Sequence, residues 1–184
     1  MFKVKDDEKI YILQKYWIPE DLVEKRIKED GVPYDKWHKK GLIDYCQGNR
    51  IDHRDVANWF RYVQSELDIY MFKVGYDSWS ANYLIQDIKD TFGEEVIEPV
   101  IQGKKTLSSP MKSLAADLKS GKIVYGDNPI LEWCISNVKA DRDKNDNIQP
   151  VKTSNPKQRI DGFASLLDAY VAYEKYYDDY CGIL

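Results

Sequence analysis

Two aspartates stand at positions where a carboxylate can do chemistry. Asp77 follows the apolar run 69–76, which predicts a central strand, and Asp161 immediately precedes the apolar helix predicted over 162–177. Ligands of open α/β sheets gather at the carboxyl ends of strands, so a carboxylate there can face a crevice. Two such carboxylates, if the fold brings them together, can hold Mg²⁺ ions about 4 Å apart for phosphodiester hydrolysis. The alternative for each residue alone is a helix N-cap.

Further polar residues are candidates for the same site. Asp168 lies on the same helix face as Asp161 and is a candidate extra metal ligand. The basic residues that could hold a phosphate backbone are Lys104, Lys105, Lys152, Lys157 and Arg159. The alternative is that these basic segments are ordinary solvated loops. A net charge of −4 argues against a large nucleic-acid footprint.

Other metal-binding residue types are scarce. The 184 residues contain two histidines (His38, His53) and three separated cysteines (Cys46, Cys134, Cys181). This scarcity argues against a zinc site or a disulfide framework, and it favours carboxylate ligands for Mg²⁺ or Mn²⁺. The acidic cluster Asp141, Asp143 and Asp146 lacks the glycine and glutamate of a calcium loop, which predicts a solvated hairpin tip.

The composition predicts one folded domain. Hydrophobic residues make up 43% and aromatic residues 13% of the chain, which excludes a disordered protein. No run of about 18 apolar residues is present, and the first residues have no apolar signal-peptide core. Unclustered free thiols are typical of a reducing cytoplasm, which is where we expect the chain to work.

Periodicity and turn residues predict alternating strands and helices. We expect strands at 2–5 and 10–18 around a polar turn, then at 42–46, 69–76, 96–101 and 123–125, with a hairpin over 138–152. We expect helices at 20–30, 52–67, 80–92, 109–120, 128–137 and 162–177, and an irregular link at 32–41. The order between residues 69 and 125 predicts an α/β sheet with parallel pairs.

Short stretches in a fixed order carry a resemblance to a known family. They are 16–20 (YWIPE), 32–37 (VPYDKW), 48–52 (GNRID), 75–79 (GYDSW), 102–103 (QG), 107–112 (LSSPMK), 128–137 (NPILEWCISN) and 157–162 (KQRIDG). This ordered set resembles the nuclease domain of the large terminase subunit of tailed bacteriophages, over nearly the whole chain. GYDSW and the IDG segment are its most specific parts.

The resemblance implies a ribonuclease H-like mixed sheet with flanking helices that cuts concatemeric phage DNA in the bacterial host cell. It implies a carboxylate cluster with two Mg²⁺ or Mn²⁺ ions, in which GYD corresponds to Asp77 and IDG to Asp161. It also implies double-stranded DNA, a terminase small subunit and a portal as partners.

Two departures from the family are visible. The phosphate-binding loop of the family's ATPase motor has no counterpart here. The chain also begins inside what resembles the second strand, so we expect the first strand and its aspartate to be absent. An edge exposed in this way is expected to self-associate.

Three hypotheses therefore remain open. They are a metal-dependent nuclease domain, a catalytically inactive remnant of the same fold, and a generic α/β protein-binding module. The first requires that Asp77 and Asp161 lie within roughly 8 Å of each other.

Overall fold

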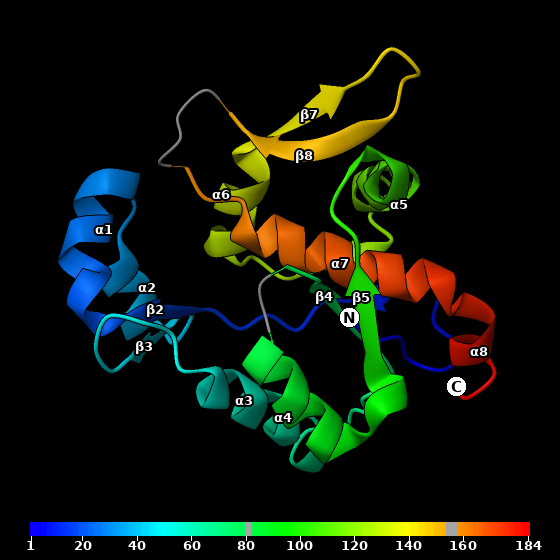
Figure 1. The fold of residues 1–184 in the computed structure, drawn as a ribbon, viewed down its shortest axis with the longest axis horizontal. Coiled ribbons are helices and arrows are strands. Elements are labelled where there is room, and N and C mark those ends of the chain that lie inside the picture. The colour runs from blue at the N-terminus through cyan, green and yellow to red at the C-terminus, as the bar shows by residue number, and fades with distance from the viewer. Residues whose placement is uncertain (80–81, 154–157) are drawn as a thin grey trace.

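The computed structural model describes residues 1–79, 82–153 and 158–184. It is a mixed α/β fold of short strands with flanking helices, and one long helix runs through its centre (Figure 1). None of the described helices has the length and apolar composition needed to cross a membrane.

The elements follow one another in a nearly regular alternation. The first part contains β1 (Ile10–Tyr11), β2 (Trp17–Pro19), the 3₁₀ helix η1 (Glu20–Leu22), α1 (Val23–Asp30), α2 (Tyr34–Lys39), β3 (Asp44–Cys46) and α3 (His53–Ser65). The middle contains β4 (Val74–Asp77), α4 (Asn82–Phe92), the 3₁₀ helix η2 (Glu94–Val96), β5 (Ile97–Val100), α5 (Lys104–Lys119) and β6 (Ile123–Val124). The last part contains α6 (Pro129–Ser136), β7 (Val138–Arg142), β8 (Ile148–Lys152), α7 (Asp161–Lys175) and α8 (Tyr177–Cys181).

Strand pairing confirms one parallel pair predicted between residues 69 and 125, that of β4 with β5, whereas β6 pairs with β1 at the start of the chain. β1 pairs with β6, β2 with β3 and β4 with β5, all parallel, while β7 and β8 form the expected antiparallel hairpin. Within the described residues these are four separate two-stranded sheets, so the predicted continuous sheet is reduced to short ladders.

Two strand predictions were wrong in extent. The expected hairpin of residues 2–5 and 10–18 is a single antiparallel bridge between Phe2 and Tyr11, because β1 pairs with β6 instead. The expected strand 69–76 is ordered as a strand only over β4, because its partner β5 offers four residues. Upstream of β4, the side chain of Tyr70 is 69% exposed, so this run is not covered on both faces.

Two helix predictions were also wrong. The supposed link 32–41 contains helix α2, whose Tyr34 and Trp37 are buried. Helix α5 begins at Lys104, and Pro110 lies inside the helix rather than at its start. Proline lacks an N–H and normally disfavours a helix interior. The buried side chains of Leu107, Met111 and Leu114 lie at helical spacing on either side of Pro110, and their burial maintains the helix through this position.

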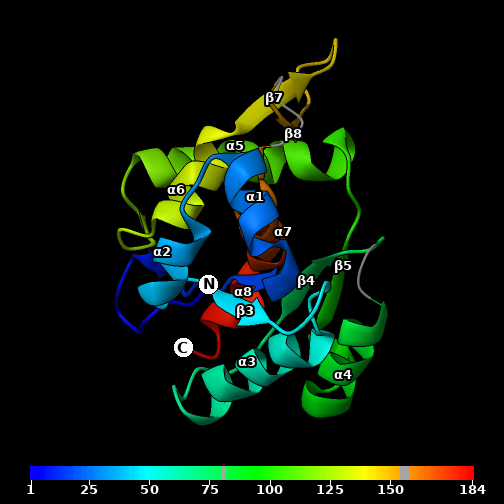
Figure 2. The same ribbon diagram turned by 90° about the vertical axis from the view of Figure 1, so that its left-hand side faces the viewer.

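Helix α7 is the most buried of the described helices, as predicted. It packs against β4, β5, α5 and α6 and carries six buried side chains. Both views place it between the α3–α4 pair and the β7–β8 hairpin (Figures 1 and 2). Gly75 of β4 permits a close approach, since a Cβ atom there would lie 2.4 Å from the backbone oxygen of Asp168. These packing contacts therefore fix α7 directly across the strand that ends at Asp77.

Candidate active site

Asp77 is the last residue of β4 and lies opposite Val100 in the parallel register. It is half-buried, and its Oδ1 accepts a hydrogen bond from the backbone N–H of Trp79 at 3.0 Å. This bond closes the turn that follows the strand, and the described part of helix α4 runs from Asn82. The Asp77 carboxylate is thus held at the carboxyl end of the β4–β5 pair, as the sequence predicts.

Asp168 lies beside Asp77 in the fold. Its side chain is buried on α7 and its Oδ1 accepts a hydrogen bond from Gln102 Nε2 at 3.0 Å. Burial raises the pKa of Asp168 to about 6; the Gln102 hydrogen bond opposes this rise, and the negative charge of Asp77 adds to it. The ends of β4 and β5 and the middle of α7 therefore converge on two carboxylates and one amide.

Sequence reasoning did not identify Gln102 as a site residue. It lies two residues after the end of β5, and its Nε2 also donates to the carbonyl of Val100 at 3.3 Å, which orients the amide toward Asp168. The signal was present, because Gln102-Gly103 is one of the stretches that carry the family resemblance.

Asp161 stands at the other end of the same helix surface. It is exposed and is the first residue of α7, so the N-cap is Ile160, which has no side-chain capping bond. The partial positive charge of a helix N-terminus favours a carboxylate at this position. Asp161 is close enough to raise the pKa of Asp30 and of the Cys134 thiol, although burial is the larger cause in both. Seven residues of helix place Asp161 roughly 10 Å from Asp168 along the axis.

The donor chemistry fits a hard divalent cation. Asp77 and Asp168 offer carboxylate oxygens, which Mg²⁺ and Mn²⁺ prefer. A buried carboxylate with a raised pKa beside a second carboxylate is a pair that a cation would stabilise. The described residues contain no group of three or more His, Cys, Asp or Glu side chains placed to hold a metal, so this part of the chain presents an incomplete set of ligands.

The basic candidates differ in what they contact. Lys105 and Lys152 are exposed, whereas Lys104 forms an ion pair with Asp141 at 2.7 Å. Arg159 Nε lies 3.4 Å from Asp30 Oδ2. Lys157 lies outside the described residues.

The other candidate clusters have structural roles. Asp143 accepts hydrogen bonds from the backbone N–H groups of Asn145 and Asn147 within the β7–β8 turn, which is the hairpin tip predicted. Both histidines are on the surface, as expected. All three cysteines are free thiols.

Comparison with known proteins identifies the family. The sequence model described as "Terminase large subunit, endonuclease domain" matches residues 1–175. The chain is 29% identical over 175 residues to Protein YmfN of Escherichia coli (strain K12), covering 89% of this chain and 37% of that protein. It is 25% identical over 154 residues to "Terminase, large subunit" of Enterobacteria phage HK97, covering 82% of this chain and 29% of that protein.

A solved structure has the same fold. The crystal structure of the HK97 bacteriophage large terminase superposes with a TM-score of 0.74 at 24% sequence identity, covering 85% of this chain and 32% of that chain. The chain thus spans about a third of the length of these relatives. With a family match over nearly all of its length, this chain belongs to the family of terminase large-subunit endonuclease domains.

Proposed function

We propose that this chain is a ribonuclease H-like, metal-dependent endonuclease domain that cuts double-stranded phage DNA during packaging. Its acidic pair is Asp77 with Asp168, Asp161 at the start of the same helix is a further proposed catalytic residue, and Mg²⁺ or Mn²⁺ is its cofactor. The observation that carries the proposal is the meeting of Asp168 with Asp77 at the carboxyl end of β4, in a chain of this family.

The protein's own groups have distinct tasks in this proposal. When bound, the divalent cation would polarise the scissile phosphate and activate water for attack. Gln102 holds Asp168 in place through its amide, and Asp77 is anchored by the turn to Trp79. Because burial raises the pKa of Asp168 to about 6, this carboxyl is mostly ionised only toward neutral pH when no cation is bound.

DNA is held, in this proposal, by the basic residues Lys104, Lys105, Lys152, Lys157 and Arg159 through the phosphate backbone, without base readout. The terminase small subunit and the portal are the proposed partners in a packaging assembly in the bacterial cytoplasm. The unpaired edges of the described two-stranded sheets support self-association as well. Light scattering that finds only monomer across a concentration series would contradict the self-association.

One observation favours a second candidate, a domain that keeps the fold without the activity. The ligand set formed by the residues the structure describes is incomplete, since no three metal-binding side chains cluster. Two carboxylates alone supply −2 against the +4 of two divalent cations, which predicts weak metal binding. A protein-binding module of the same fold is the corresponding role.

A plasmid-nicking assay with Mn²⁺ separates the candidates. The wild-type chain is compared with Asp77→Asn, Asp161→Asn and Asp168→Asn, and Asp179→Asn on exposed helix α8 is the matched control. The endonuclease proposal requires nicking that each site substitution reduces by at least about 100-fold, as expected for removal of a metal-binding carboxylate, while the control stays active.

The same proteins are then heated with and without Mn²⁺. A ligand that binds the folded state raises the melting temperature. We expect a rise for the wild type and the control and none for Asp77→Asn or Asp168→Asn. A wild-type chain that neither nicks DNA nor responds to Mn²⁺ supports the inactive domain.

A further inference from the structure

The start of helix α7 has no local cap. Its N-cap residue, Ile160, has φ −123° and ψ 10°, and makes no side-chain capping bond. Among the described residues, the Cys134 thiol of α6 accepts hydrogen bonds from the backbone N–H groups of Gly162 and Phe163 in the first turn, so the bonds at this helix start come from a distant element. Side-chain caps normally fix the residue at which a helix begins. The position of Asp161, the first residue of α7, must therefore be set by contacts from elsewhere in the fold.

Asp30 supplies one such contact, although its carboxylate is buried and only partly paired. Its side chain is 0% exposed, and its Oδ2 accepts hydrogen bonds from the Tyr34 hydroxyl at 2.8 Å and from Arg159 Nε at 3.4 Å. Its Oδ1 is buried without a hydrogen-bond partner among the described residues. Burying a carboxylate that is only partly paired is unfavourable, so stability alone does not account for it.

The position of Asp30 in its own helix is also unfavourable. It is the last residue of α1, where the helix dipole disfavours a negative charge. Arg26, on the same helix, partly offsets this, and the charge of Asp161 raises the pKa of Asp30 further. Local helix preferences thus argue against aspartate here, whereas contacts with the Tyr34 hydroxyl at 2.8 Å and with Arg159 Nε at 3.4 Å favour it.

Asn137 supplies the second contact. It follows α6, its side chain is buried, and its Nδ2 donates to the backbone carbonyl of Arg159 at 3.0 Å. The Asn137 carbonyl in turn accepts the N–H of Thr153 at 3.1 Å, at the end of β8. Arg159 is therefore held at its carbonyl by one element and at its guanidinium by another.

We propose that Asp30 and Asn137 are positioning residues that clamp Arg159 and so set the start of α7 and the direction of Asp161. The inference rests on the proposed function in taking Asp161 as a site residue. Behind the clamp, the rings of Tyr34, Trp37 and Trp133 pack with centroids 5.4 to 6.2 Å apart. The resemblance stretches 32–37 and 128–137 and the described part of the third, 158–162, lie far apart in sequence and thus meet at this clamp.

The decisive variant is Asp30→Asn, which keeps the shape and one acceptor but removes the charge. Its matched control is Glu29→Gln, the neighbouring carboxylate on α1, which pairs with Lys25 and Arg26 and not with Arg159. Amide hydrogen exchange is measured on the whole chain. We expect exchange at residues 161–165 to rise by about tenfold or more in Asp30→Asn, because a charge-assisted hydrogen bond is lost, with β7–β8 unchanged. Exchange equal to that of Glu29→Gln overturns the clamp.

A second variant covers the case in which Asp30→Asn does not fold. Arg159→Gln removes the other partner and leaves a carboxylate that can be protonated. It should open the same segment, and the double variant should add less than the sum of the two single effects, because both substitutions break one contact. Additive effects would contradict the inference.

Nicking kinetics test the consequence for Asp161. If Asp30→Asn misaligns Asp161, this variant should have a lower kcat and an unchanged KM for DNA. General destabilisation does not produce that combination. Faster exchange at 161–165 with unchanged kcat refutes the positioning of Asp161. If the wild-type chain does not nick DNA, the proposed function fails, and the Asp161 carboxyl carbon shift in NMR decides the inference instead. A shift that Asp30→Asn leaves unmoved overturns it.

Discussion

Helix α7 and the α3–α4 pair flank the same two strands, β4 and β5, but different forces hold them. The main core contains α7 side chains such as Leu167 and Tyr170 together with Leu114 and Leu131, all at most 3% exposed. Among the described residues, the smaller core cluster under α3–α4 has Val74, Ile88 and Val96 as its buried members. Ala57, Val63 and Ile85 on these helices are buried as well, outside that cluster. The two sides of the strand pair therefore differ in how much apolar surface fastens them.

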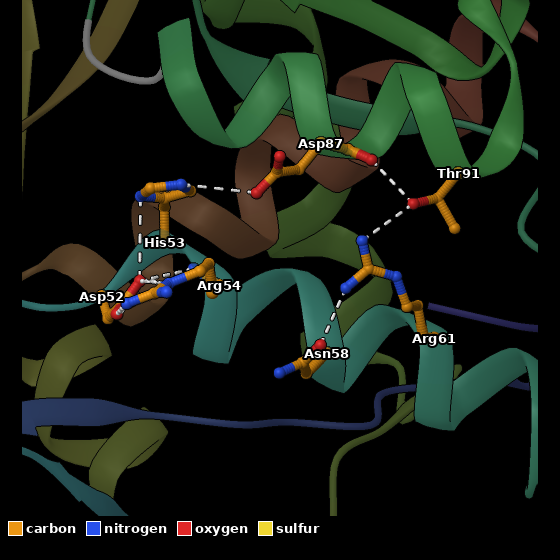
Figure 3. A network of polar contacts seen from close by, with 7 residues as sticks. All are labelled: Asp52, His53, Arg54, Asn58, Arg61, Asp87 and Thr91. Atoms are coloured by element: carbon orange, nitrogen blue, oxygen red, sulfur yellow. Dashed lines mark hydrogen bonds and ion pairs between the residues drawn. The ribbon is translucent and has the colours of Figure 1, made fainter.

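Polar contacts supplement the small core between α3 and α4 (Figure 3). His53 lies between two carboxylates, with Nδ1 3.8 Å from Asp52 and Nε2 3.4 Å from Asp87. Arg61 reaches from α3 to Thr91 Oγ1 at 3.0 Å. These groups are partly exposed, and ion pairs in contact with water contribute little to stability.

The difference bears on the site. Asp161 and Asp168 lie on the helix that the main core holds rigidly, while Asp77 leads into the α3–α4 side, which has the smaller core. We infer that α7 is the fixed reference of the site and that the α3–α4 side opens at lower free energy.

The largest effects are expected from core substitutions made separately on the α7 side and on the α3–α4 side of the strand pair. Leu167→Ala removes a side chain that is 1% exposed in the main core, and we expect it to lower the free energy of unfolding by about 3–4 kcal/mol in urea denaturation. Ile88→Ala, equally buried, should mainly raise hydrogen exchange within α3 and α4. Exchange that rises throughout the chain in Ile88→Ala would show that the two sides unfold as one unit.

Gly75→Ala tests the contact that joins β4 to α7. The new Cβ would lie 2.4 Å from the Asp168 carbonyl oxygen, so the helix must shift, and we expect a loss of about 2–3 kcal/mol. Ser78→Ala, on the exposed turn after β4, is the control. Unfolding midpoints that are the same for both variants would mean that α7 adjusts without cost.

Asp168→Asn sharpens the comparison through pH. The folded pKa of Asp168, about 6, lies above its ordinary value, so the folded state favours the protonated form. The stabilisation that protonated Asp168 gives the folded state is fully present below about pH 4 and is lost as the pH rises through about 6. In metal-free buffer, as the pH rises between those values, the free energy of unfolding of the variant should therefore increase relative to that of the wild type by an amount on the order of 2 kcal/mol. A stability difference that is flat with pH, measured by urea titration at each pH, would contradict the burial of this charge.

The smallest effect is expected on the polar side. His53→Ala removes the contacts with Asp52 and Asp87 and should cost under about 1 kcal/mol, because the pair is exposed. At a pH at which His53 is protonated, the loss should shrink further at high salt, which screens surface charges. A larger, salt-independent loss in thermal denaturation would mean that the network in Figure 3 fastens α3 to α4 more strongly than its exposure suggests.

The sequence by itself determined most of the helices and the β7–β8 hairpin, because their signals are local. Asp52 and Asn128 cap α3 and α6 through their side chains as their residue types predict, and Gly31 ends α1 with φ 71°. Asp77 could be placed at a strand end from the sequence because an apolar run followed by an acidic residue is a local pattern.

Only the tertiary structure decided which residues meet. That β1 pairs with β6, that Asp168 faces Asp77 and that Asp30 meets Arg159 depend on contacts between residues far apart in the chain, which no local propensity encodes. Helix α5 makes the same point, since buried neighbours maintain it through Pro110 against the local preference. Burial gives the Asp168 and Asp30 carboxyls their raised pKa values, and burial follows from packing once the chain has folded.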